Sequence, residues 1–108
     1  MEINIEREYN EKTGESTVVV ESPYGVSIGK AQLKEKDARL ESPRTGIIIA
    51  ELKALIKNEH KRYMLAIDSD EVQDALDQRE AYEQELIHFK KGKEDFRKKY
   101  YKLHNLTE

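Results

Sequence analysis

The residues in this 108-residue chain most suggestive of catalysis are Gly25-Val26-Ser27-Ile28-Gly29. The pattern Gly-x-Ser-x-Gly presents a nucleophilic serine on a strand-to-helix turn of a large α/β sheet, with an acid and a histidine later in the chain. Here the five residues fall inside a predicted strand, and a charged segment follows them. We therefore expect Ser27 to be an outward-facing strand residue without a catalytic role.

A second pattern, Glu85-Leu86-Ile87-His88, has the Glu-x-x-His spacing of carboxylate-bridged di-iron bundles. The seven-residue repeat described below turns Leu86 and Phe89 inward, so that Glu85 and His88 lie on the flanks of their helix. Glycine-rich phosphate loops and zinc-helix histidine spacing are also missing from the sequence. The sequence thus predicts no enzyme activity, no metal site and no cofactor.

Composition limits the size of the core. Hydrophobic residues make up 37% of the chain and charged residues 38%, with no Trp. Since a small domain buries a small fraction of its surface, this supply predicts one domain that is elongated or completed by a partner. The absence of Cys, of a signal peptide and of a long apolar run predicts a cytoplasmic protein.

The first third of the chain has the period-two pattern of strands. Apolar residues alternate from Ile3 to Tyr9, residues 17–20 are β-branched throughout, and alternation resumes from Tyr24 to Ile28. Asn10–Gly14 and Ser22–Gly25 carry the Gly and Pro signals of short turns. The pattern predicts a three-stranded antiparallel meander.

The next predicted element is a helix that begins at Pro43 after a charged connector, residues 34–41. Ser42 is placed to cap it. An apolar stripe then runs through Ile49, Leu52, Ile56, Tyr63 and Ile67. We expect this stripe to lie across the sheet and to form the core.

A long helix is predicted from Asp68, which with Glu71 imitates a capping box, to about residue 104. Its apolar residues follow a seven-residue repeat that Arg79 and Lys93 interrupt. The repeat predicts a coiled coil or a long packed helix. We name its apolar positions the seam: Val72, Ala75, Tyr82, Leu86, Phe89, Phe96, Tyr100 and Leu103.

Charge is divided along this helix. Residues 68–85 hold eight acids and one base, a local charge of −7, whereas residues 88–102 hold seven bases and two acids, a local charge of +5. Dipole complementarity involves only the first and last turns. A homodimer with antiparallel helices would set each acidic half against a basic half, and we expect this arrangement.

The alternative is that the basic end of the helix binds a phosphate backbone or an acidic partner. Its candidate contact residues are Lys90, Lys91, Lys93, Arg97, Lys98, Lys99, Tyr101 and Lys102. Tyr101 lies off the seam and is the aromatic residue free to stack on a base.

Small residues recur on both sides of the connector. Gly29 and Ala31 form a Gly-x-Ala strand end, Asp37 lies in the linker, and a Gly-x-x-Ile-Ala-x-x-Lys-Ala helix follows, with Gly46, Ile49, Ala50, Lys53 and Ala54. These elements resemble a family of small proteins from phages and prophages of Gram-positive bacteria. The linker lacks that family's usual Cys and Pro, and Lys53 replaces its common Arg. The resemblance implies a phage or prophage origin and no particular activity.

The sequence as a whole predicts an α+β protein. A three-stranded antiparallel meander packs on one helix in residues 1–67, and a long coiled-coil-like helix follows in residues 68–104. The predicted function is a non-enzymatic interaction factor that inhibits or modulates a host-defence or nucleic-acid enzyme in the host cytoplasm. The alternative is a DNA- or RNA-binding accessory protein.

Overall fold

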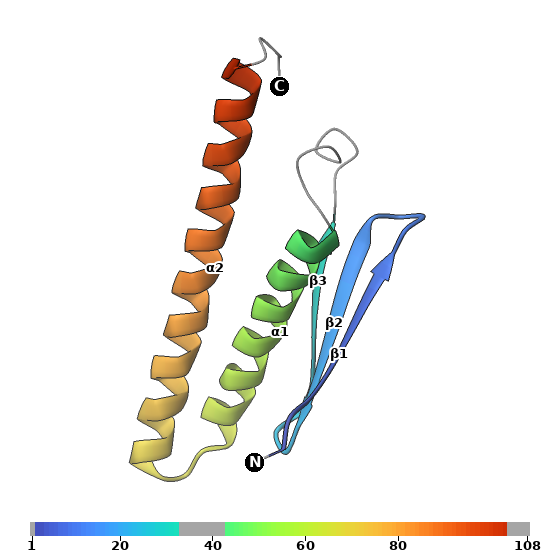
Figure 1. Cartoon of the computed structure of the whole chain (residues 1–108). Coiled ribbons are helices and arrows are strands. Elements are labelled where there is room, and N and C mark those ends of the chain that lie inside the picture. The colour runs from blue at the N-terminus through green and yellow to red at the C-terminus, as the bar shows by residue number, and fades with distance from the viewer. Residues whose placement is uncertain (1, 33–42, 104–108) are drawn as a thin grey trace.

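The computed structural model describes residues 2–32 and 43–103, and at residues 96, 97, 100, 101 and 103 it describes the backbone alone. The predicted connector, with Asp37 and Ser42, lies outside the described residues. The fold is α+β and elongated, with extents of 56 × 27 × 16 Å. It has three layers: the sheet, then helix α1, then helix α2 (Figure 1).

The sheet is an antiparallel meander with strand order β1-β2-β3, as predicted. Its strands are β1 (Asn4–Asn10), β2 (Glu15–Ser22) and β3 (Gly25–Gln32). Gly14 ends the first turn with a φ of 74°, and Gly25 opens β3 with a φ of 123°, both in the region that favours glycine. Short turns of this kind hold the three strands in sequential order.

Helix α1 (Pro43–Leu65) begins at Pro43, as predicted, and lies close against one face of the sheet. Its Ala50 and Ala54 pack on Val18 and Val20 of β2, and all four side chains are fully buried. Gly29 of β3 permits the close approach, because a Cβ there would overlap the carbonyl oxygen of Ala50. Small residues on both elements therefore seat the helix.

The predicted orientation of α1 is wrong. The residues that pack on the sheet are Ile47, Ala50, Ala54 and Leu55, whereas Leu52 lies about 200° around the helix from Ala50. Leu52 is buried, and two other members of its stripe lie at α2: Ile56 lines a hollow with Arg79, and the centre of the Tyr63 ring lies 6.0 Å from Arg79. A helix between two layers buries two faces, and here the wider apolar face meets the other helix.

The connection between the helices corrects the predicted end of α1. Helix α1 ends at Leu65, so Ile67 lies in the connection and its side chain is 99% exposed. Asp68 then caps α2 (Ser69–Leu103), as predicted: its carboxylate accepts a hydrogen bond from the amide of Asp70 at 2.7 Å.

In the described part of the chain α2 packs on α1 and not on the sheet. The seam positions from Val72 to Phe89 are buried or half-buried. Since α1 has 23 residues and α2 has 35, the antiparallel α2 continues well past the start of α1 (Figure 1). Neither of these helices, within the residues described, is long and apolar enough to cross a membrane.

Candidate functional site

Ser27 lies on the inner face of the sheet beneath α1, so its predicted outward orientation is wrong. The residue is 2% exposed, and its hydroxyl is buried without a hydrogen-bond partner among the described residues. Small residues, Ser27, Gly29 and Ala31, line the inner face of β3 because α1 comes so close. The larger Val26 and Ile28 consequently point outward.

The Glu85 and His88 side chains are exposed on α2, off the seam as expected. Within residues 2–32 and 43–103, no group of three or more His, Cys or acidic side chains is placed to hold a metal ion. The two patterns that suggested chemistry in the sequence therefore assemble no catalytic constellation in the described structure.

None of the described elements covers the outer face of the sheet, because both helices lie on the opposite side (Figure 1). The strand register places Glu6, Val19 and Ile28 side by side across it. Ile28 is 42% exposed and the neighbouring Val26 is 51% exposed. An aliphatic patch thus lies at the β3 side of this face.

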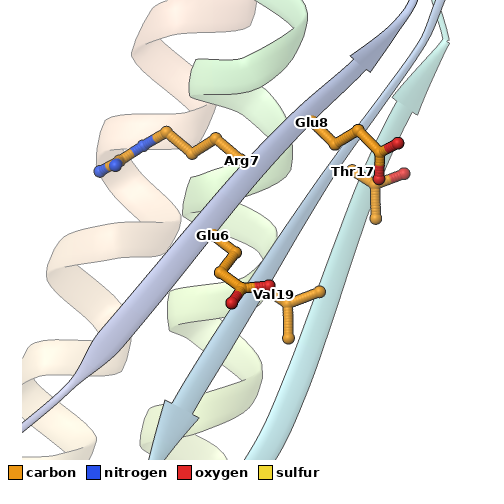
Figure 2. Close-up of a pocket in the computed structure, with 5 residues that line it drawn as sticks. All are labelled: Glu6, Arg7, Glu8, Thr17 and Val19. Carbon is orange, nitrogen blue, oxygen red and sulfur yellow. The ribbon is translucent and has the colours of Figure 1, made fainter.

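Carboxylates border the patch on its β1 and β2 sides. The register brings Glu8 beside Thr17, and Glu21 beside Val26. An open hollow of about 480 Å³ on this face is lined by Glu6, Arg7, Glu8, Thr17 and Val19, and Figure 2 labels these five residues. Apart from the Asn and Gln residues, the side chains that the register places on this face are the following, and we call them the outer face: Glu6, Glu8, Glu15, Thr17, Val19, Glu21, Val26, Ile28 and Lys30.

The side chain of Arg7 points to the opposite side of β1 from the side chains of Glu6 and Glu8 (Figure 2). Its guanidinium donates to Glu51 of α1 at 2.5 Å, on the inner side of the sheet. The one base on the outer face is Lys30, which lies 4.0 Å from Glu15. The outer face is therefore acidic toward β1 and β2, and its exposed apolar residues lie toward β3.

The opposite charge gathers where α1 passes the edge of β3. Three lysines at i, i+4 and i+8, Lys53, Lys57 and Lys61, form what we call the lysine row. Lys53 Nζ donates to the carbonyl of Lys30 at 3.0 Å, and Lys57 Nζ donates to that of Ile28 at 2.6 Å. Lys61 Nζ donates to the carbonyl of Val26. The row thus occupies alternate outward carbonyls of an edge strand.

A hollow of about 390 Å³ adjoins the lysine row between α1 and α2. Arg79 of α2 is held there by three contacts. It donates to His60 Nδ1 at 3.0 Å, pairs with Glu83 at 3.3 Å and lies 6.0 Å from the centre of the Tyr63 ring. The lining residues are Ile56, Lys57, His60, Lys61, Arg79 and Glu83.

On the other side of the helix pair, Arg62 joins α1 to the acidic half of α2. It pairs with Asp74 at 2.6 Å, with Glu71 at 3.6 Å and with Glu59 at 3.3 Å. The Asp74 hydrogen bond raises the pKa of Arg62, while burial raises the pKa of Glu59 despite the nearby Arg62. The acidic half of α2 therefore finds a cation within its own chain.

Among the predicted contact residues, Lys90 lies near Lys53, and Lys93 is half-buried. The others whose side chains are described are exposed along α2: Lys91, Lys98, Lys99 and Lys102. The side chains of Phe96, Arg97, Tyr100, Tyr101 and Leu103 lie outside the described residues. Sequence reasoning missed the lysine row, although its spacing of four residues was a visible signal.

The small residues that carry the phage-family resemblance meet at the contact between α1 and the sheet. Gly46 lies over Ser16 of β2, and Ala50 and Ala54 lie over Gly29. The pattern therefore has a packing role in this structure. Comparison of the chain with protein-family models, with curated proteins and with solved structures finds no match.

Proposed function

We propose that this protein is a non-enzymatic binding protein that engages a partner protein through the outer face of its sheet. One observation carries the proposal. Helix α1 covers one side of the sheet and α2 lies on α1, so the described residues leave the patch of Val19, Val26 and Ile28 uncovered, with carboxylates on its β1 and β2 sides. Exposed apolar surface with a polar rim is typical of sites that bind other proteins.

The charge of the outer face defines the partner. Glu6, Glu8 and Glu21 favour a basic surface with an adjoining apolar patch, since complementary potentials steer association and set its register. Enzymes that bind nucleic acid carry such basic surfaces. Together with the phage-family resemblance, this supports an inhibitor or modulator of a host-defence or nucleic-acid enzyme that acts in the host cytoplasm.

The position of Ser27 supports the non-enzymatic assignment. A nucleophilic serine needs a base within hydrogen-bond reach and access for the substrate. Ser27 is 2% exposed beneath α1, and His60 and His88 are both exposed on the helices.

Self-association through α2 stays a prediction from the sequence, and the proposal does not require it. In the described chain α1 occupies the seam from Val72 to Phe89, and the seven-residue repeat thereby pairs two helices of one molecule. A dimer that used only the part after Gly92 would bring two basic ends together, and this repulsion favours a different partner. Light scattering at micromolar concentration decides: twice 12.6 kDa would show the dimer.

Affinity capture from host lysate tests the function, with wild type, Ile28→Lys and Met64→Lys as baits. Met64 is the matched control because its side chain is 67% exposed at the end of α1, away from the outer face. We expect one partner that survives nuclease treatment, is retained by Met64→Lys and is lost with Ile28→Lys. Capture that nuclease abolishes, or that Ile28→Lys leaves unchanged, would contradict the proposal.

A further inference from the structure

The lysine-bearing side of the molecule holds more positive charge than its surroundings neutralise. Lys53 and Lys57 lie one turn apart on α1, and Lys90 of α2 is near enough to Lys53 for its charge to act on that side chain; in the described part of the chain no carboxylate lies within ion-pair distance of these three. Burial, then Lys90, then Lys57 lower the pKa of Lys53. An anionic ligand would relieve this repulsion.

The lysine row is also held in position. Each of its ammonium groups donates a hydrogen bond to a carbonyl of β3. An ammonium has three N–H donors, so two remain on each lysine for oxygen atoms of a ligand. Four residues of helix advance about 6 Å, and the three charges therefore form a line along the strand edge. A linear array of fixed cations suits a linear polyanion.

The hollow beside the lysine row adds a place for a flat group. Its lining residues include Ile56, His60, Arg79 and the acid Glu83, which pairs with Arg79. The contacts of Arg79 with Glu83, His60 and Tyr63 hold its guanidinium in place. Unpaired bases stack on aromatic rings and on guanidinium planes. A duplex keeps its bases stacked inside the helix and presents none for such a hollow.

We propose that the lysine row, Lys90 and this hollow bind single-stranded nucleic acid, with phosphates on the ammonium groups and a base beside Arg79. The site is separate from the outer face and does not depend on the function proposed for it. It also differs from the site predicted at the basic end of α2. Lys90 belongs to both sets of residues.

The probe is a fluorescein-labelled oligothymidylate of about twelve nucleotides, within the usual site size, followed by anisotropy between about 50 and 200 mM salt. We expect a Kd below about 100 µM at the lower salt, in the range of non-specific binding. Lys57→Gln and Lys90→Gln should each weaken binding several-fold and reduce the salt slope by about 0.7, the value for one phosphate contact on a single strand.

Three controls separate the site from general charge and from folding. Lys12→Gln removes an exposed lysine from the turn between β1 and β2, and should leave the Kd unchanged. Lys57→Arg keeps a cation and a donor, and should retain binding. Lys90→Gln leaves the hydrogen bonds of the lysine row to β3 in place, so its loss of binding is not explained by a freed strand edge.

Four results would overturn the inference. These are a Kd above about 1 mM at low salt, equal losses with Lys12→Gln and Lys57→Gln, tighter binding of polyglutamate than of the oligonucleotide, and a dimer in light scattering that Lys57→Gln dissociates. The third would identify an acidic protein segment as the ligand. The fourth would identify the acidic outer face of a second copy.

Discussion

The outer face of the sheet and the lysine row meet at β3, the first as the exposed surface of the sheet and the second along its edge. The two regions hold their charged groups in different ways. On the outer face, Glu6, Glu8 and Glu21 are exposed side chains beside an aliphatic patch. At the edge of β3, the ammonium groups of Lys53 and Lys57 are bonded to main-chain carbonyls. Exposed side chains can adapt to a partner, whereas anchored ones present a fixed pattern to which the ligand must conform.

The edge contacts have a second consequence. An edge strand presents unpaired carbonyls on which another chain can add as a strand. In β3 the carbonyls of Val26, Ile28 and Lys30 accept from the lysine row instead. The same three lysines therefore close that edge to strand addition and position positive charge.

Helix α1 packs closely on Gly29, and this contact covers the inner face of the sheet. Gly29→Ala should lower the free energy of unfolding by about 3 kcal/mol, the upper end of the usual range for overpacking, because the new Cβ meets backbone atoms that cannot rotate away. Denaturant unfolding measures the change.

Gly92→Ala is the matched control, since among the described residues no atom beyond the adjacent helix backbone lies within 4 Å of a Cβ built there in α2. The same substitution should raise the free energy of unfolding by about 0.5–1 kcal/mol, the helix propensity gain. Equal effects at the two positions would show that α1 does not sit on Gly29 as the structure has it.

Removal of Arg62 tests how firmly α2 is held on α1. The hollow beside the lysine row depends on that packing, because residues of both helices line it. Arg62→Ala leaves Glu59 buried without its cation and should cost about 2–3 kcal/mol. Lys98→Ala breaks an exposed pair with Glu94 and should cost less than about 0.5 kcal/mol. Thermal and denaturant unfolding compare the two variants.

The pH dependence of Arg62→Ala has a definite sign. Burial raises the pKa of Glu59 above its ordinary value of 4.5, so its favourable contribution exists below that pH and is lost as the pH rises through the folded pKa. Without Arg62 that pKa rises further. The destabilisation should therefore be larger at neutral pH than below pH 4.5; a constant difference would exclude Glu59 as its cause.

Much of the sheet was predictable from the sequence because alternation and turn residues are local properties. The meander, the turn at Gly14, the start of α1 at Pro43 and the cap at Asp68 all follow from neighbours along the chain. The orientation of α1 did not follow, because the stripe containing Leu52 gave no indication of which of two layers it would meet.

The inner face of β3 was mistaken for a related reason. Val26 and Ile28 alternate as a buried set would, but the close approach of α1 requires small side chains, and Ser27 and Gly29 take the inner positions. The lysine row was missed because its partners are main-chain carbonyls. Every residue has a carbonyl, so no sequence pattern distinguishes the ones that remain free at a sheet edge.

Paired valine substitutions compare the two faces of the sheet directly. Val18 is 0% exposed on the inner face, and Val18→Ala should cost about 2 kcal/mol through lost burial and a cavity. Val26 is 51% exposed on the outer face, and Val26→Ala should cost less than about 0.5 kcal/mol. A large loss at Val26 would mean that the outer face is covered in the native molecule.

The smallest expected effect is a change in one pKa on the lysine-bearing side. Lys90 is one of the groups that lower the pKa of Lys53 below 10.5, so Lys90→Gln should move that pKa part of the way back. Burial is the larger cause and is unaffected, so the recovery should be incomplete. Titration of the Lys53 side chain by NMR measures the shift.

Lys91→Gln is the control for this titration, because residue 91 points about 100° around α2 from Lys90 and its charge is exposed. The shifted pKa of Lys53 also determines how this residue makes folding stability depend on pH. A lowered folded pKa means that Lys53 contributes fully only above pH 10.5, and that this contribution is lost as the pH falls through the folded pKa. Lys90→Gln should therefore flatten stability against pH in the alkaline range, and Lys91→Gln should not. An identical Lys53 pKa in both variants would place Lys90 too far from the row to share a phosphate chain with it.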